Sequence, residues 1–284
     1  ISRLNTLSLR MLLMTDLRSS QTSFESPPVY ETALAIQFEE LTKFRAIHFG
    51  RFHQTVRDQF PESEDHGRTE PINETFPTVP RQLRLQLVEK KHGPERVWFR
   101  DRVDGSLLLQ LQPDRFGLNW RRVEGSGAYP SFEQNGEMFL ERFARFQQFC
   151  DDEGIGPLNP DWVEVVYVNH IVPFEGETAV DCFGTIFEGL NWGLSDQWLS
   201  SPELVTFNRV FPIGDQQGRL FAEAGVARGS QSREIVLMKM TARVMHKSGS
   251  QLAESLQLAH NFVTNGFVSL TTDAARQERW GQAQ

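Results

Sequence analysis

The sequence WVEVVYVNHI, residues 162–171, carries apolar side chains on both of its alternating faces. Successive side chains of a β-strand point to opposite sides of the sheet, so this pattern is typical of a strand covered on both sides. We therefore expect residues 162–171 to form a central strand. Residues 30–38 alternate with a period of two and predict another strand, with one buried face.

The sequence patterns in the first half of the chain predict, in this order, a strand, a helix, several short strands and a second helix. Apolar and aromatic side chains recur at every fourth position from residue 44 to 60, which predicts a helix stopped by Pro61. Ser131 and Gln134 have the spacing of a capping box, and we expect a long helix to begin there. Period-two patterns between the helices predict short strands at residues 83–87, 97–102, 107–111 and 116–120.

The second half repeats this order with weaker patterns. Residues 181–199 stand where the equivalent of the first helix is expected, although each of their glycines disfavours a helix by about 1 kcal/mol relative to Ala. An apolar stripe from Leu252 to Leu270 predicts a final helix. Strands are predicted between these helices at residues 204–211, 219–228 and 234–245.

This order predicts an α+β fold with two topologically similar halves, each built as strand, helix, three strands and helix. We expect helices to cover antiparallel sheets and the halves to form a pseudo-dimer. The corresponding domain prediction is a flexible N-terminal tail at residues 1–27, a first lobe at residues 28–158 and a second lobe at residues 159–284.

The composition is that of an ordinary globular protein, with 39% hydrophobic residues and a net charge of 29 − 37 = −8. This charge argues against a nucleic-acid or anionic-membrane partner. It does not exclude a local basic patch that binds nucleic acid. Residues 7–14 are apolar but short and interrupted by Arg10, so we expect no membrane segment. The two cysteines are too few for a disulfide framework and favour a cytoplasmic location.

Motifs for well-marked enzyme classes are absent from the sequence, including nucleotide-binding loops, nucleophile elbows and zinc-protease signatures. The seven histidines are scattered, and the carboxylates of residues 151–153 lack the spacing of cation ligands. Cys150 and Cys182 lie among apolar neighbours and resemble small core residues. We therefore predict no catalytic residues, no metal site and no cofactor.

The segment LLLQLQPDRFGLNWRR, residues 107–122, carries the densest set of polar recognition groups. As a hairpin it places amide and guanidinium side chains on one surface, and these groups bind rather than catalyse because they do not titrate near pH 7. The same pattern is also explained by a hairpin face that is simply exposed to solvent, and this alternative interpretation is not excluded. The candidate partner- or ligand-binding residues are Gln110, Gln112, Arg115, Asn119 and Arg121, with Trp120 as an aromatic anchor.

Several short segments, in order along the chain, resemble an uncharacterised, sporadically distributed bacterial protein family of about 250 residues, a length typical of one or two domains. The segments are PVYETALAIQF (28–38), LLLQLQPDRFGLNWRR (107–122), YPSF (129–132), VVYVNHI (165–171), AHNFVTNGFVSLTT (259–272) and WG (280–281). The resemblance implies no established activity. A patchy distribution is typical of genes that move among bacteria, including those of defence and toxin–antitoxin loci.

Three functions remain open at this level. The first is a non-enzymatic cytoplasmic interaction or regulatory protein, such as an accessory or antitoxin-like component of a mobile defence locus, with a protein partner of unknown identity. The second is a small-molecule sensor with a cleft between the two halves, lined by Trp162, Tyr167 and Trp192. The third is an enzyme without a known motif that acts on an anionic substrate bound by the arginines of the hairpin.

Overall fold

The computed structural model of the chain describes residues 24–76, 95–123, 129–190, 198, 202–229 and 233–282. The strand predicted at residues 83–87 lies outside these residues, as does the predicted tail up to residue 23. The four residues that follow in the tail are described, and Phe24 forms an isolated bridge with Gln282 and edge-to-face contacts with Phe267 and Trp280. The described end of the tail therefore contacts the C-terminal segment.

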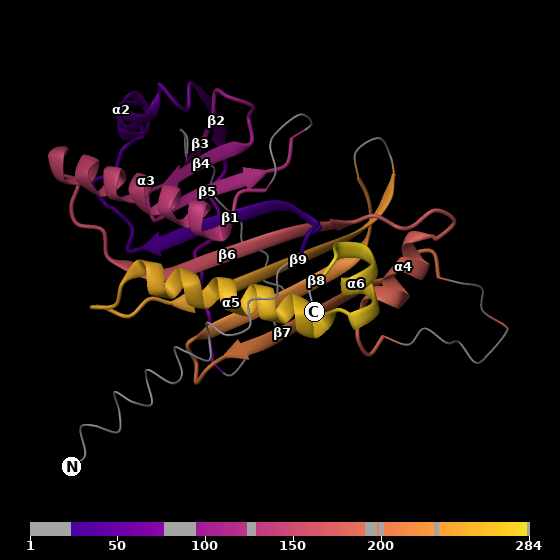
Figure 1. Cartoon of the computed structure of the whole chain (residues 1–284). Helices are drawn as coiled ribbons and strands as arrows, with labels where there is room; N and C mark the ends of the chain where they lie inside the picture. The colour runs from indigo at the N-terminus through magenta and orange to yellow at the C-terminus, as the bar shows by residue number, and fades with distance from the viewer. Residues whose placement is uncertain are drawn as a thin grey trace, which may run out of the picture.

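Nine strands of the described residues form one antiparallel sheet in the order β2-β3-β4-β5-β1-β6-β9-β8-β7 (Figure 1). The strands are β1 (Val29–Phe38), β2 (Glu62–His66), β3 (Arg96–Arg100), β4 (Leu107–Gln112), β5 (Arg115–Arg121), β6 (Pro160–Ile171), β7 (Thr206–Ile213), β8 (Gly218–Arg228) and β9 (Glu234–Met245). The predicted α+β class is confirmed. The strands of both halves belong to a single sheet, whereas the sequence predicted separate sheets.

The centre of the sheet is the pair formed by β1 and β6. β6 pairs with β1 on one side and with β9 on the other, so the prediction of a central strand at residues 162–171 is confirmed. Its partner β1 begins the first half of the chain and β6 begins the second. Within the sheet, the two halves are therefore joined by one strand pair.

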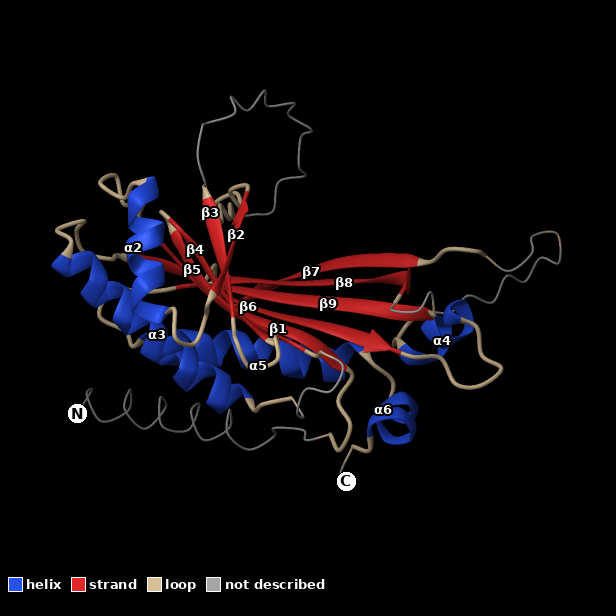
Figure 2. Ribbon diagram, turned by 90° about the horizontal axis from the view of Figure 1, so that it is seen from above, coloured by secondary structure: helices blue, strands red, loops and turns tan. Residues whose placement is uncertain are grey.

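Five helices are described: α2 (Ala46–Val56), α3 (Phe132–Asp152), α4 (Ala179–Ile186), α5 (Leu252–Leu270) and α6 (Asp273–Trp280). Figure 2 shows α3 and α5 side by side on one side of the sheet. The predicted capping box of α3 is present, because Ser131 and Gln134 bond each other's backbone N–H groups. Helix α4 ends at Ile186, so the helix expected up to residue 199 is shorter than predicted.

Aromatic side chains fill the space between α2, α3 and the sheet. Phe116 of β5 is fully buried and contacts three phenylalanines of α3 at ring distances of 5.9, 5.6 and 5.5 Å. These partners are Phe139, Phe143 and Phe146. Phe52 of α2 joins the same cluster through Phe116 and Phe146. The apolar face of each element is thus directed to one side of the sheet.

Helix α5 approaches the second half of the sheet closely at Gly266. A Cβ atom at this position would lie 2.6 Å from Leu220 Cδ2 and 3.0 Å from Met240 Cε. Both distances are shorter than ordinary contacts between carbon atoms, so glycine permits the close packing of α5 on β8 and β9.

Removal of the Phe116 ring will destabilise the protein. We expect Phe116→Ala to lower the free energy of unfolding by about 3–5 kcal/mol, because the cavity lies among rings that cannot collapse into it. Urea titration measures this loss. Phe211→Ala is the control, since Phe211 is 37% exposed on edge strand β7, and we expect a much smaller loss. Equal losses for the two variants would contradict this assignment of the core.

Candidate functional site

The sheet has a second face, opposite α3 and α5, on which most of the predicted recognition residues lie. Phe116 and Leu118 of β5 are buried on the helix-covered face. Because side chains alternate along a strand, Arg115, Gly117 and Asn119 point to the other face. Among the described residues, no helix covers this second face at β5. We call this second face the uncovered face (Figure 2).

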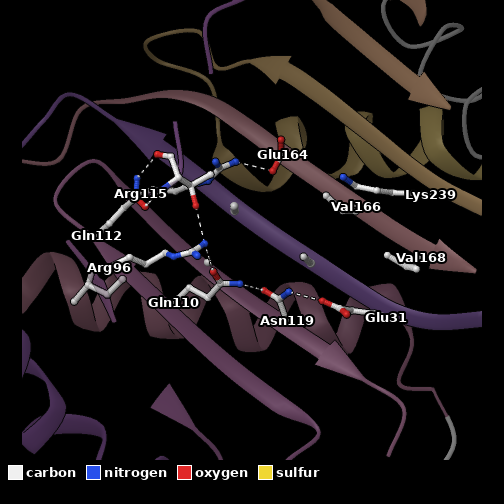
Figure 3. Close-up of a pocket in the computed structure, with 15 residues that line it drawn as sticks. Glu31, Arg96, Gln110, Gln112, Arg115, Asn119, Glu164, Val166, Val168 and Lys239 are labelled. Carbon is white, nitrogen blue, oxygen red and sulfur yellow. Dashed lines mark hydrogen bonds and ion pairs between the residues drawn. The ribbon is translucent and has the colours of Figure 1, made fainter. Parts of the chain in front are cut away.

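A pocket of about 250 Å³ lies on the uncovered face, across the β1–β6 pair (Figure 3). Its floor is made of small or branched apolar residues from three strands. The floor residues are Ala33 and Ala35 of β1, Gly117 of β5, and Val166 and Val168 of β6. Polar side chains rise on both sides of this floor, so the pocket combines an apolar base with hydrogen-bonding walls.

One wall is a chain of hydrogen bonds between neighbouring strands. Gln110 Nε2 donates to Asn119 Oδ1 at 2.7 Å, and Asn119 Nδ2 donates to Glu31 Oε1 at 2.7 Å. Arg96 Nη1 donates to Gln110 Oε1 at 3.4 Å. Figure 3 shows these four side chains in one row along the pocket. Each amide is held by its neighbours, which gives the wall a defined pattern of donors and acceptors.

The opposite wall contains Arg115 and Glu164, which begin a line of alternating charges that continues outside the pocket. Arg115 Nη2 lies 2.6 Å from one oxygen of Glu164, and Arg243 Nε lies 2.7 Å from the other. Arg243 Nη1 also lies 2.9 Å from Glu74 Oε1, and Glu74 forms a further ion pair with Arg219. This line joins β5, β6, β9 and β8. Its carboxylates are fully engaged by arginines and are poor candidates for a general base.

The segment 67–76 crosses the uncovered face beside the pocket. Gln112 holds its first part, because Thr69 N donates to Gln112 Oε1 at 3.2 Å and Gln112 Nε2 donates to Thr69 O at 3.1 Å. Gln37 accepts from Ile72 N at 2.5 Å, and Glu74 pairs with the arginines of β8 and β9. The segment therefore spans both halves of the sheet and limits the pocket at one end.

Four of the predicted site residues, Gln110, Gln112, Arg115 and Asn119, line this pocket together. Gln112 is only 1% exposed and serves to hold the segment 67–76. Arg121 is exposed but does not line the pocket. Trp120 is buried on the helix-covered face against Tyr129, so the prediction of an exposed aromatic anchor is wrong. Its immediate neighbour Asn119 faces the pocket, and alternation forces Trp120 to the other side.

The predicted cleft of Trp162, Tyr167 and Trp192 is not formed by the described residues. Trp162 and Tyr167 are an odd number of positions apart in β6 and point to opposite faces. Both are buried, and neither lines the pocket. Trp192 lies outside the described residues.

Pocket residues that sequence patterns did not single out come from other strands. Arg96, Glu31, Glu164 and Lys239 all line the pocket. Glu164 carried a usable signal, because it is a charged residue in a strand that is otherwise apolar. Arg96 and Lys239 carried none, since ordinary surface strands contain such residues and only strand order brings them here.

Tyr167 belongs instead to a buried hydrogen-bonded group beneath the sheet. Its hydroxyl lies 2.9 Å from the Tyr129 hydroxyl and 3.1 Å from His260 Nδ1. His260 also stacks on Phe132 at a ring distance of 3.8 Å. Burial lowers the pKa of His260 to about 4 and raises the pKa of Tyr129 to about 12, so both side chains are neutral near pH 7.

The part of the chain that the structure describes holds neither a metal-binding cluster nor a reactive thiol. Within it, no group of three or more His, Cys, Asp or Glu side chains is placed to hold a metal ion. Cys150 and Cys182 are buried free thiols, and burial raises the pKa of each to about 12, which disfavours the nucleophilic thiolate. Among the described helices, none combines the length and apolar character needed to cross a membrane.

No protein-family model matches the chain, and no match was found among curated proteins or solved structures. The resemblance to the uncharacterised bacterial family therefore stays a prediction. The geometry of the site offers hydrogen-bond donors, hydrogen-bond acceptors and positive charge around a small apolar floor.

The pKa of His260 predicts a loss of stability in mild acid. The unfolded chain takes up a proton near pH 6.5, whereas folded His260 does so only near pH 4, so the unfolding free energy falls as the pH is lowered through this window. Each pKa unit corresponds to about 1.4 kcal/mol, so we expect His260→Gln to remove about 3 kcal/mol of this loss. Urea titrations from pH 7 to pH 4 measure it. Parallel pH profiles for both proteins would contradict the assignment.

Proposed function

We propose that the protein is a non-enzymatic interaction or regulatory protein of the cytoplasm that binds its partner through the uncovered face of the sheet. The observation that carries this proposal is the pocket, because its walls hold amide and guanidinium groups that are already oriented by one another and by the carboxylates of Glu31 and Glu164. Amides and guanidinium groups bind by hydrogen bonds and charge, and they supply no base or nucleophile. A pocket of this size fits one side chain or one small group of a partner.

The role in a mobile defence locus is a more specific proposal and rests on the family resemblance. Two features of the chain are compatible with an accessory or antitoxin-like component. Its stability comes from one extensive core, and its recognition groups lie on strands rather than on loops. Groups on strands are held in place before the partner arrives, which lowers the entropy cost of binding.

We further propose that the two halves are a duplicated unit that packs as a pseudo-dimer. The strand order supports this, since β3-β4-β5-β1 on one side of the centre mirrors β7-β8-β9-β6 on the other. Each half also contributes one helix after its first strand and one after its last. On this proposal the pocket lies at the seam between the units.

The position of the pocket at the seam also favours a second candidate, a small-molecule sensor. Both halves contribute lining residues, for example Arg96 from the first and Lys239 from the second. A ligand that contacts both halves binds most tightly to one relative arrangement of the halves. Binding therefore shifts the conformational equilibrium of the protein toward that arrangement. The volume of about 250 Å³ restricts such a ligand to a small molecule.

The interaction function predicts that filling the pocket abolishes partner binding. The tagged chain is co-expressed with its genomic neighbours, and we expect a stoichiometric partner to co-purify with it. Ala33→Leu places a larger side chain on the floor and should reduce the co-purified partner at least about ten-fold, since a clash at a buried contact costs more than 1.4 kcal/mol.

Ala227→Leu is the matched control. Ala227 belongs to β8 and lies, like Ala33, on the uncovered face of the sheet, but it does not line the pocket. We expect it to retain the partner. Thermal melts of both variants show whether they are folded. The proposal is wrong if no partner co-purifies, or if folded Ala33→Leu retains as much partner as the wild type does.

A further inference from the structure

We infer that the pocket binds a small organic anion, with a carboxylate or phosphoryl group between Arg96 and Arg115 and a short apolar body along the floor. This inference rests on the proposed function in one respect, because both require the uncovered face to be a binding surface. It names the ligand class, which the interaction function leaves open.

The first argument is the local balance of charge. The pocket is lined by three cationic side chains, Arg96, Arg115 and Lys239, and by two carboxylates, Glu31 and Glu164, a balance of 3 − 2 = +1. Glu164 is shared with Arg243, which lies outside the lining, so its negative charge is directed partly away from the pocket. The whole chain has a net charge of −8. A positive pocket in a negative protein is a selective place for an anion.

The second argument is the state of Arg96. Its guanidinium donates to two neutral oxygens, Thr69 Oγ1 at 2.6 Å and Gln110 Oε1 at 3.4 Å. Within the described residues no carboxylate forms an ion pair with it, and its buried Nε has no hydrogen-bond partner. Arg96 is partly buried, and a partly buried guanidinium without a counter-ion loses hydration that a bound anion would replace with charge-assisted hydrogen bonds.

The surroundings of Arg96 keep its charge at the pocket. The guanidinium carbon lies 5.2 Å from the centre of the Trp98 ring, which provides a cation–π contact. Burial and the charge of Arg115 both lower the pKa of Arg96, although an arginine stays protonated near pH 7. Arg115 is held by Glu164 at 2.6 Å. Two fixed guanidinium groups therefore flank the same end of the pocket.

The third argument is the shape and polarity of the floor. Gly117 and the two alanines leave open the space that larger side chains would fill, and the valines of β6 continue the apolar surface (Figure 3). The volume of about 250 Å³ is below the range of about 300–1,000 Å³ that is usual for drug-sized ligands. The pocket thus suits a compact ligand with one charged end.

Isothermal titration of the purified full chain with three matched probes tests this inference. The probes are benzoate, phenyl phosphate and benzamide, which share a ring and differ in the group attached to it. We expect at least one of the two anions to bind at a single site, and the neutral benzamide to bind at least ten times more weakly, a difference of about 1.4 kcal/mol. Comparison of benzoate with phenyl phosphate shows which anionic group is preferred.

Variants then locate the site. Arg96→Gln removes the charge and should weaken anion binding at least ten-fold, whereas Arg100→Gln should leave it unchanged. Arg100 is the matched control because it lies on the same strand and the same face, outside the pocket. Ala33→Leu should also weaken binding by occupying the floor. This second variant keeps the test decisive if Arg96→Gln fails to fold, which thermal melts would show.

Several results would overturn the inference. These are no binding of either anion, equal binding of benzamide, full binding by the folded Arg96→Gln or Ala33→Leu variant, or an equal loss in Arg100→Gln. The outcomes also separate the two proposals. Anion binding without a co-purified partner contradicts the interaction function alone, whereas a partner that depends on the pocket, without anion binding, contradicts this inference alone.

Discussion

The pairing of β1 with β6 is the interaction on which the rest of the structure depends. It joins the strands of the first half to those of the second in one sheet, in a register from Val29 opposite Asn169 to Phe38 opposite Pro160. Without it each half would expose the unpaired backbone groups of an edge strand. The pocket would also be divided, because its floor is formed by β1, β5 and β6.

The two faces of this sheet have different physical roles. On one face the helices and the sheet enclose one hydrophobic core that includes the aromatic cluster around Phe116, and burial of apolar surface is the main source of stability. On the other face Glu164 and Glu74 are held between arginines. Such partly buried ion pairs contribute little net stability, since desolvation offsets their attraction, but they orient side chains. Separate faces allow the recognition groups to vary without disturbing the core.

Part of the candidate site could be predicted from the hairpin alone. Gln110, Arg115 and Asn119 lie on neighbouring strands joined by a short turn, so alternation and the turn together place them on one surface. The same alternation contradicts the choice of Trp120, which follows Asn119 directly. Arg96 and Glu164 are different, because their approach to the hairpin depends on strands that are distant in sequence.

Local patterns in the sequence by themselves determined the α+β class, the central strand at residues 162–171 and the capped start of α3, because periodicity and capping act between residues close along the chain. Only the tertiary structure decided that β1 pairs with β6, that the segment 67–76 crosses the sheet, and that Arg96 and Arg115 meet at one pocket. These contacts join residues far apart in the sequence. They follow from the packing of the whole chain, for which no local pattern carries the information.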